Sequence, residues 1–381
     1  MIYGLTSRDR LLLALQRKEP DRVPIWMLFP RERLPYYADV YNEPSYAPVI
    51  PYVLKYTDFF DRRGFPRPPF LTAAAVERQE IIEDGEYTIT RRIIDTPLGP
   101  LVAQVRRHRD GHIAPGDSFA FFREIEDLEK ALSIPYEPFS PPLDEFRDAA
   151  ARLGDAGLMM ADLGTAISIL YHATDTQQFA IWTLTEMDAL EHFVRVMHQR
   201  LEVMVHELLE QGVGPVWFLV GSEFVIPPLV SPAVFDRLVA PFDGRLIEMI
   251  HDHGGYAIVH HHGPIDELLE GIADMGADGI QPIEAPPQGN CTMAEAKRRV
   301  GDRVCLIGSI QYGDIQLGTP EEIEAQVRQT ILDAGQGGGL ILAPTAGPYE
   351  PQITPRTAAN YIRFIEAGLR WGRYPLQAVS S

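Results

Sequence analysis

Cysteine is scarce in this chain, which has only Cys291 and Cys305 among its 381 residues. Two cysteines are too few for a framework of disulfide bonds, and they form no C-x-x-C spacing, so redox chemistry by a pair of thiols is not expected. Long apolar runs are also lacking, since none approaches the roughly 18 residues that a membrane-spanning helix needs. Residues 1–8 lack the charged start, apolar middle and cleavage site of a secretory signal. We therefore expect a cytoplasmic protein with no membrane partner.

Positive charge is in short supply as well. The chain has 34 Lys and Arg against 53 Asp and Glu, a net charge of −19, and no local cluster of basic and aromatic residues offsets it. Such a surface repels a phosphate backbone, so nucleic acid is not an expected partner. A hydrophobic content of 45% and a charged content of 23% are typical of a globular protein. The length suits one barrel domain with additions, and we expect residues 1–381 to form a single domain.

Strand-like and helix-like patterns alternate along most of the chain. Helix starts are marked by Ser231-Pro232 and by the capping box Thr319-Pro320-Glu321-Glu322. The predicted strands are residues 23–29, 58–61, 157–163, 216–221, 256–262, 279–284, 304–307 and 340–343. Eight strands alternating with helices predict a closed (β/α)₈ TIM barrel of the α/β class. An open doubly wound sheet is the alternative, but no G-x-G-x-x-G follows any of these strands.

A different pattern interrupts this alternation. Residues 87–94 and 101–105 are rich in β-branched residues and are separated by Thr96-Pro97-Leu98-Gly99-Pro100, a turn signal. The pattern predicts an inserted β-hairpin over about residues 86–107. We expect it to decorate the barrel without adding to it.

The most informative segment is Tyr256-Ala257-Ile258-Val259-His260-His261-His262-Gly263, an apolar run that ends in three histidines. In a strand, successive side chains point to opposite faces, so His260 and His262 share one face while His261 takes the other. Two imidazoles on one face are able to bind one divalent metal, and zinc is the ion for which imidazole is a common ligand. Solvated or hydrogen-bonded loop histidines are the alternative.

Acidic residues follow other strands of the predicted barrel. Asp162, Glu223 and Glu284 lie at or just after predicted strand ends, as the histidines do. Active sites of such barrels lie at the carboxyl ends of the strands, so these groups are expected to meet on one rim as a metal or acid–base site. Tyr349 follows the last strand between Pro348 and Glu350, on a loop suited to covering a substrate.

Several further segments carry a family resemblance. They are Thr6-Ser7-Arg8-Asp9-Arg10, Glu19-Pro20-Asp21-Arg22-Val23-Pro24, Leu229-Val230-Ser231-Pro232, His260-x-His262-Gly263, Gly318-Thr319-Pro320-Glu321-Glu322 and Gly337-Gly338-Gly339-Leu340-Ile341-Leu342-Ala343-Pro344. In this order and spacing the chain resembles the uroporphyrinogen decarboxylase superfamily, which includes the decarboxylases and the corrinoid-dependent methyltransferases. The resemblance covers most of the chain and implies the distorted (β/α)₈ barrel.

Each branch of the superfamily leaves a mark on the sequence. Decarboxylases carry Arg-Gln-Ala-Gly-Arg after the first strand, where this chain has Arg31, Glu32 and Arg33 in a different setting; the two arginines still suit binding of substrate carboxylates. Methyltransferases hold zinc on His-x-Cys-Gly, and here His262 replaces that cysteine. Their distal cysteine is absent too, because the matching residues 343–347 contain none.

The resemblance implies a metal site on His260 and His262 that needs a further ligand. Glu223 is the candidate for that ligand and for a catalytic role, with Glu284 as the reserve; either carboxylate is also able to hold the second nitrogen of a ligand histidine. Asp162 is a second catalytic candidate. Arg31, Arg33, Glu284 and Tyr349 are the expected substrate-binding residues. Mixed imidazole and carboxylate ligands suit zinc, iron, nickel or cobalt.

The hypothesis that follows is a metal-dependent methyltransferase acting on a small acceptor or donor. Its methylcobalamin or other corrinoid would be carried on a partner protein, because the chain has no D-x-H-x-x-G segment of its own. A decarboxylase that needs no cofactor, working with Arg31, Arg33 and Asp162 in porphyrin biosynthesis, is the alternative. A metallohydrolase ranks third, because hydrolase barrels place H-x-H on their first strand, whereas here it lies on the fifth predicted strand. A binding module without catalytic activity is a further alternative. The relatives are often homodimers, so a homodimer is expected here.

Overall fold

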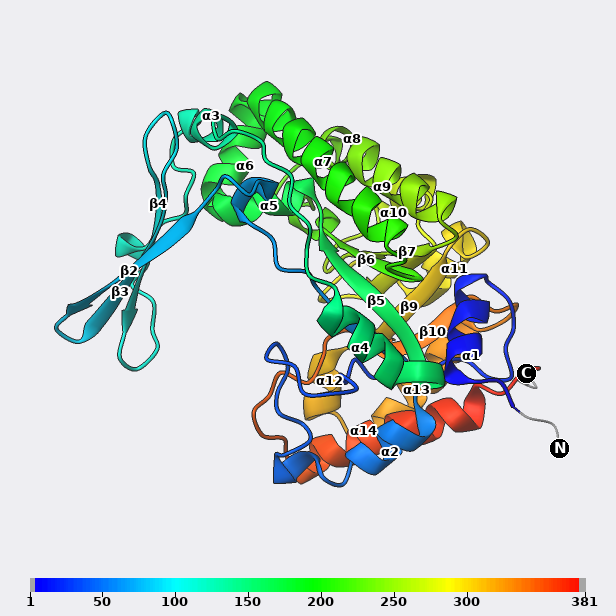
Figure 1. The fold of residues 1–381 in the computed structure, drawn as a ribbon. Helices are drawn as coiled ribbons and strands as arrows, with labels where there is room; N and C mark the ends of the chain where they lie inside the picture. Colours follow the sequence, from blue (N-terminus) through cyan, green and yellow to red (C-terminus); the bar gives the residue numbers. More distant parts are fainter. Residues whose placement is uncertain (1–3, 377–381) are drawn as a thin grey trace.

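The computed structural model of the protein describes residues 4–376, so that Met1–Tyr3, part of the segment predicted to be no secretory signal, lie outside the described residues. Seven parallel strands form one curled sheet in the order β1-β5-β6-β7-β8-β9-β10 (Figure 1). They are β1 (Phe59–Arg63), β5 (Gly157–Gly164), β6 (Val216–Val220), β7 (Tyr256–His260), β8 (Gly279–Ile283), β9 (Cys305–Ile310) and β10 (Leu340–Pro344). The predicted α/β barrel is confirmed.

The eighth place in the barrel is taken by an extended segment and not by a full strand. Ile25 forms a single parallel bridge with Leu342, where Trp26 N donates to Leu342 O at 2.9 Å. On its other side Ile25 O accepts from Asp58 N at 2.7 Å. The strand predicted over residues 23–29 is therefore wrong in extent. Pro24 has no N–H to donate, and Leu28 adopts a φ of 61°, which turns the chain out of line.

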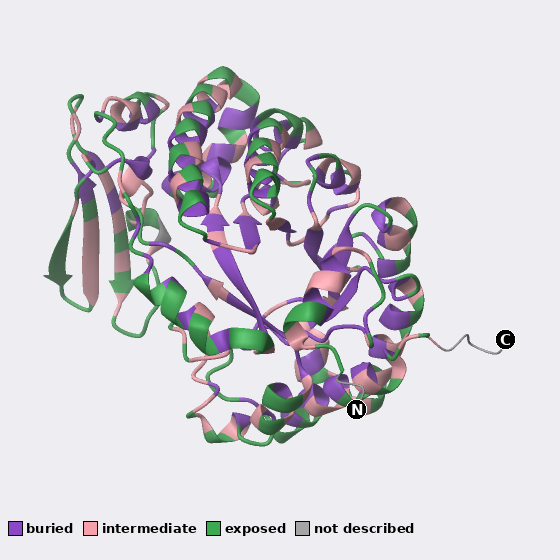
Figure 2. Cartoon of the chain, turned by 45° about the vertical axis from the view of Figure 1, so that its right-hand side comes forward, coloured by how far each residue is buried: buried purple, intermediate pink, exposed green. Residues whose placement is uncertain are grey.

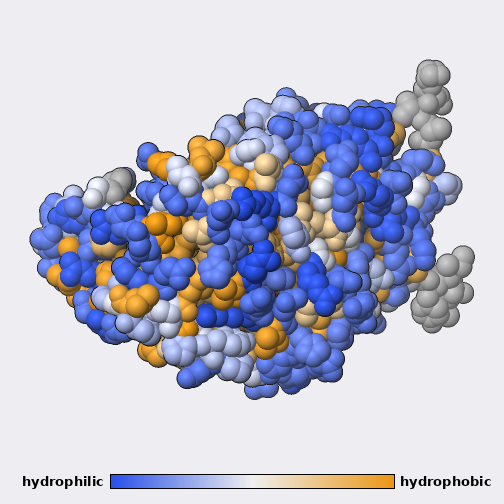
Figure 3. Space-filling model, turned by 90° about the horizontal axis from the view of Figure 1, so that it is seen from above, coloured by the Kyte–Doolittle hydropathy of each residue, from blue (hydrophilic) through white to orange (hydrophobic). Residues whose placement is uncertain are grey.

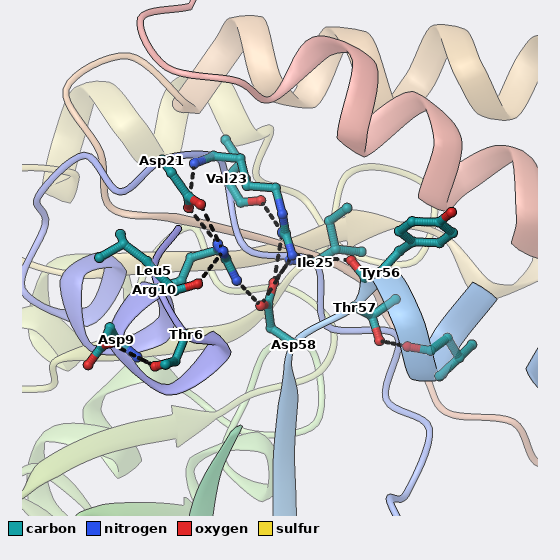
Figure 4. Close-up of polar contacts among 12 residues, drawn as sticks. Leu5, Thr6, Asp9, Arg10, Asp21, Val23, Ile25, Tyr56, Thr57 and Asp58 are labelled. Atoms are coloured by element: carbon teal, nitrogen blue, oxygen red, sulfur yellow. Dashed lines mark hydrogen bonds and ion pairs between the residues drawn. The ribbon is translucent and has the colours of Figure 1, made fainter. Parts of the chain in front are cut away.

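A buried carboxylate secures this closure (Figure 4). Asp58 is fully buried, and its oxygens accept from Arg10 Nη1 at 2.7 Å, Arg22 Nη1 at 2.8 Å and the backbone N of Ile25 at 2.9 Å. Arg10 comes from α1 (Ser7–Leu15) and also pairs with Asp21. The network joins the first helix, the closing segment and the start of β1, because a buried carboxylate needs several donors to offset its lost hydration.

Helices cover the outside of the sheet (Figure 1). The capping predictions are confirmed: the Ser231 side chain accepts from Ala233 N, and Thr319 forms a capping box with Glu322. The helices after α1 are α2 (Ile50–Tyr56), α3 (Glu126–Leu132), α4 (Asp144–Leu153), α5 (Ala166–Ala173), α6 (Thr176–Thr185), α7 (Met187–Glu210), α8 (Pro232–Leu238), α9 (Ala240–Asp252), α10 (Leu269–Asp274), α11 (Met293–Val300), α12 (Tyr312–Leu317), α13 (Pro320–Ala334) and α14 (Pro355–Trp371). Within residues 4–376, no helix combines the length and apolar character needed to cross a membrane.

Short 3₁₀ turns complete the described elements, and one of them, η5 (Ser222–Phe224), carries a residue of the candidate site. The others are η1 (Pro44–Tyr46), η2 (Pro69–Leu71), η3 (Pro115–Asp117) and η4 (Gly154–Ala156).

Alternation along the strands produces two cores. Inward residues such as Met160, Phe218 and Ile258 fill the barrel, and Leu11 and Leu15 of α1 pack with this inner cluster. The outward residues pack against the helices in a larger cluster. Figure 2 shows the result, with barrel strands buried and the outer faces of the helices exposed. Because the inner core is apolar, any polar residue at an inward position stands out as a candidate for function.

The predicted hairpin is confirmed and is part of a larger feature. β3 (Tyr87–Ile94) and β4 (Leu101–His108) pair antiparallel, and β2 (Glu77–Asp84) adds a third strand to form a sheet that projects from the barrel (Figure 1). The sequence did not predict β2, because its residues are mainly charged and exposed, without the alternation of a half-buried strand. Seen from above, the surface is mostly hydrophilic, and its apolar groups gather on the half nearer this sheet (Figure 3).

Candidate functional site

The strand period brings polar side chains to the carboxyl-terminal rim of the barrel. Arg62 follows the inward Phe60 by two residues, Asp162 follows Met160, and His260 follows Ile258. Since alternate residues share a face, these polar groups continue the inner core at the end where it opens. The predicted convergence on one rim therefore has a local cause in each strand.

Glu223 reaches this rim from η5, just after β6. The turn begins at Gly221, where a Cβ atom would lie 2.2 Å from Thr165 Oγ1 and 2.8 Å from Ile167 Cγ2. Only glycine allows the chain to pass this closely, because those distances are shorter than real Cβ contacts. This close approach fixes the position at which the η5 backbone begins, and it thereby positions Glu223.

Three of the predicted residues come together as a candidate metal site. Glu223, His260 and His262 each offer one ligand atom, and these atoms all lie within 4.8 Å of one another. His260 Nε2 is 3.5 Å from Glu223 Oε2, and the two imidazole centroids are 4.7 Å apart. Two imidazoles and one carboxylate are a donor set that zinc and other divalent first-row metals accept, so the residues fit the expected group.

The second nitrogen of each imidazole is engaged behind the site. His260 Nδ1 lies 2.7 Å from Gln281 Oε1 and 3.0 Å from Gln281 O, and His262 Nδ1 lies 3.2 Å from Glu284 Oε2. We assign the ring proton to Nδ1 in both, because these partners include oxygens that only accept. Nε2 of each ring then carries a free lone pair, which is the tautomer that a metal-binding histidine needs.

Burial shapes the charges of these groups. Burial lowers the pKa of His260 to about 3, with His262 and Arg62 adding to the effect. Burial also lowers the pKa of His262, but the hydrogen bond and charge of Glu284 outweigh it and leave that pKa raised. Burial raises the pKa of Glu223, partly offset by His262. A neutral imidazole beside a poorly hydrated carboxylate is an arrangement that a bound cation would stabilise.

His261 turns away from the site, as predicted. It is fully buried, with Nδ1 3.1 Å from Ser222 Oγ and Nε2 3.4 Å from Pro264 O. Burial lowers the pKa of this imidazole to about 4. His261 is not on the cavity wall, in agreement with the prediction that it takes the other face of the strand. Its burial means that removing it would leave a void under the rim.

A cavity of about 150 Å³ lies beside the three metal-ligand candidates. Tyr349, a predicted substrate-binding residue, lines it, and Tyr349 Oη donates to Tyr36 Oη at 3.1 Å. Tyr37 stacks on Tyr349 at 5.9 Å between ring centroids and also lines the cavity. Ala346, which the family resemblance aligns near a missing cysteine, forms part of the same wall. Tyrosine rings thus cover a small space next to the metal-ligand candidates.

The other predicted substrate-binding residues lie elsewhere. Glu284 is buried behind His262 and is not part of the cavity wall. Arg31 stacks over Phe59 at 5.1 Å, and Arg33 is mostly exposed. Neither arginine is on the cavity wall.

The reason lies in the loop that carries these two arginines. Glu32, between them, accepts from Arg152 Nε at 2.6 Å, which holds the loop against α4.

Asp162, the second catalytic candidate, lies at the rim, where it accepts from Arg62 Nε at 2.8 Å.

Sequence reasoning missed three kinds of residue at the site. Arg62 lines the cavity but lay one residue beyond the predicted strand 58–61. Gln281 lies inside a predicted strand, and a single amide side chain there forms no recognisable motif. Tyr36 and Tyr37 lie on the loop that also carries Arg31 and Arg33, and only the arginines were predicted to bind substrate. The period of two from Phe60 to Arg62 would have identified the arginine if β1 had been extended to its true end.

Among the described residues one further group has metal-ligand geometry. His206 and Glu210 of α7 lie near His253 at the end of α9, and all three are exposed. His253 Nδ1 lies 2.9 Å from Met249 O and Nε2 3.1 Å from Glu210 Oε1, so an ordinary surface ion pair accounts for the contacts.

Known proteins are similar to this chain in sequence. The family model described as uroporphyrinogen decarboxylase (URO-D) matches residues 118–367. The methylcobamide:CoM methyltransferase MtaA of Methanosarcina barkeri (strain Fusaro / DSM 804) is 23% identical over 262 residues, which is 68% of this chain and 68% of that protein. The uroporphyrinogen decarboxylase of Pseudoalteromonas translucida (strain TAC 125) is 28% identical over 134 residues, 35% of this chain and 33% of that protein.

A solved structure agrees over nearly the whole chain. A methyltransferase from Methanosarcina mazei matches with a TM-score of 0.61 and 16% identity, covering 96% of this chain and 99% of that one. At this identity the match concerns the fold, which is the barrel described above. The relatives named by these comparisons are enzymes.

Proposed function

The chain belongs to the uroporphyrinogen decarboxylase family, and we propose that it is a metal-dependent methyltransferase within that family. The reaction moves a methyl group between a corrinoid, carried on a partner protein, and a small acceptor or donor. The observation that carries the proposal is the meeting of Glu223, His260 and His262 around one point beside a small cavity. The similarity to MtaA, whose name describes a methylcobamide-dependent methyltransferase, supports the same conclusion.

The residues of the site have two roles: some would bind the metal, and others orient the side chains that bind it. Glu223, His260 and His262 would hold the metal, most simply zinc, while Gln281 and Glu284 fix the two imidazoles through their second nitrogens. When bound, the metal supplies Lewis acidity to an oxygen, sulfur or nitrogen atom of the small substrate. Two imidazoles and a carboxylate donate less negative charge than a site with two thiolates, which favours activation of harder atoms such as oxygen.

The size of the cavity argues against the decarboxylase alternative. About 150 Å³ is the volume of a protein cavity that holds benzene, far below the size of a tetrapyrrole. Arg31 and Arg33, which that alternative needs at the substrate, are not on the wall. The same limit supports a partner protein that presents the corrinoid from outside while only the small substrate enters the cavity.

The test begins with metal content. After reconstitution of the purified chain with zinc, iron, nickel or cobalt in turn, we expect about one equivalent of one of these ions, and we expect His262→Ala to lose it. His206→Ala, in the exposed cluster, is the matched control and should retain the ion. If the parent chain holds none of the four ions, or His262→Ala keeps a full equivalent, the metal mechanism fails.

Activity is tested separately with free methylcobalamin as the corrinoid. Demethylation of methylcobalamin in the presence of thiol or tetrahydrofolate acceptors, followed by absorbance, should require the metal and be lost in His262→Ala. Methoxylated aromatics test the opposite direction with the reduced corrinoid. Turnover of uroporphyrinogen by the metal-free chain would instead establish the decarboxylase alternative.

A further inference from the structure

We propose that Arg62 binds an anionic group of the small substrate, so that the molecule taken by this site carries a carboxylate or a similar oxyanion. This inference rests on the proposed function and names the substrate class of the same site. It stands on the contacts of one side chain that sequence reasoning did not single out.

Arg62 presents unused donors to the cavity. Its Nε donates to Asp162 Oδ2 at 2.8 Å, and within residues 4–376 its two terminal nitrogens make no hydrogen bond. The side chain is 21% exposed and lines the cavity together with Glu223 and His260. A guanidinium has five N–H donors, and partly buried donors need partners, which a substrate oxyanion would provide.

The guanidinium is held in a fixed orientation. Its Cζ lies 4.7 Å from the ring centroid of Phe218 and 5.5 Å from that of Tyr36, so aromatic rings and the Asp162 contact restrain it together. A planar fork fixed in this way matches a carboxylate with two parallel hydrogen bonds, and little rotational freedom is lost on binding. A lysine at this position would provide charge but not this geometry.

The cavity limits the size of the anion. A volume of about 150 Å³ accommodates about one six-membered ring, and tyrosines 36, 37 and 349 provide flat walls for it. If Arg62 served only as a structural partner of Asp162, the site would show no preference for a charged ring over an uncharged ring of equal shape. Benzoate and benzamide are such a pair.

Isothermal titration calorimetry of the full chain with these two compounds tests the inference, in the metal-free and the zinc-loaded protein. We expect the parent chain to bind benzoate at least roughly 10-fold more tightly than benzamide, as charge-assisted hydrogen bonds contribute about that factor. Arg62→Gln should lose most of that preference. Asp162→Asn, which frees Arg62 from its internal carboxylate, should keep or raise the affinity for benzoate. Arg245→Gln, an exposed arginine of α9, is the control and should leave both affinities unchanged.

The outcomes separate the two proposals. The inference is overturned if the parent chain does not prefer benzoate, or if Arg62→Gln keeps the preference, which would assign the anion to the metal or to another group. If Arg62→Gln does not fold, a loss of benzoate affinity in Asp162→Asn overturns it and a retained or raised affinity supports it. A chain that binds no metal contradicts the proposed function, while the metal-free titration still decides the role of Arg62.

Discussion

Glu284 holds His262 from behind, with its Oε2 3.2 Å from His262 Nδ1, and the same oxygen accepts the backbone N–H of Gly263 at 2.7 Å. This carboxylate is buried, so it acts on the rim through the imidazole and not through direct contact with the cavity. Gln281 supports His260 in a similar way, with its Oε1 2.7 Å from His260 Nδ1, but unlike Glu284 it also lies on the cavity wall. The metal-ligand candidates are therefore supported by a second layer of acceptors that sets the tautomer and angle of each ring.

Removing this support should weaken metal binding without removing a ligand. We expect Glu284→Ala to lower the affinity for zinc by roughly 10- to 100-fold, the usual cost of losing such a partner. Glu284→Gln should restore much of the affinity, since its amide oxygen is still able to accept from Nδ1. Competition with a chromophoric chelator measures both values. Glu295→Gln, at a half-buried residue of α11 that is not on the cavity wall, is the control, and equal affinities in all four proteins would contradict the positioning role.

Asp58 should be among the most sensitive positions for stability. Asp58→Asn weakens the pairs with Arg10 and Arg22 and leaves buried cations with a poorer partner, so we expect the free energy of unfolding to fall by about 3 kcal/mol or more. Urea unfolding followed by circular dichroism measures the change. Glu248→Gln removes an exposed partner of Arg245 and should change stability little. Similar effects of the two substitutions would show that the barrel closure does not depend on the buried network.

Asp243 should make stability depend on pH. It lies in the first turn of α9, and burial raises its pKa from an ordinary value of 3.8 to about 7. Between these values the folded chain keeps a proton that the unfolded chain has lost, so the stability contributed by this group falls as pH rises from about 4 to about 7.

The isosteric substitution isolates this effect. Asp243→Asn cannot titrate, so its unfolding free energy relative to the parent chain should rise between pH 5 and pH 8. Urea unfolding of both proteins across this range provides the comparison. A difference that stays constant with pH would mean that Asp243 is ionised in the folded chain throughout.

Gly221 should couple stability to the metal site. Gly221→Ala places a methyl group against Thr165 and Ile167, so the chain must shift where η5 begins. We expect a lower thermal midpoint together with reduced metal content, because Glu223 moves with the turn. Gly313→Ala in α12 is the control: no atom lies within 4 Å of the added carbon, and alanine favours a helix. Full metal content in Gly221→Ala would show that the turn tolerates displacement.

The sequence predicted features that depend on near neighbours in the chain. The shared face of His260 and His262 follows from a period of two, and the caps at Ser231 and Thr319 follow from side chains reaching a backbone two or three residues away. The shared face and the caps each depend on only a few neighbouring residues, so the sequence predicts them without knowledge of the fold. The same reasoning did not predict strand β2, because β2 is stabilised by pairing with β3 and not by burial of an apolar face.

The local sequence did not determine which of several residues of the same type lies on the cavity wall. Glu223 and Glu284 both follow strands, yet one faces the cavity and the other lies behind an imidazole. Arg31 and Arg33 follow the closing segment, yet the arginine on the cavity wall is Arg62.

The alternation of the strands, the helix caps and the two histidines on one face were determined by the sequence alone, because each depends on local backbone geometry. Which carboxylate joins the histidines, and which arginine reaches the cavity, was decided by the tertiary structure. Those outcomes depend on distances between residues far apart in the chain: Gly221 passing close to Thr165, and Glu32 held by Arg152. Such contacts exist only once the barrel has closed and its strands have found their register.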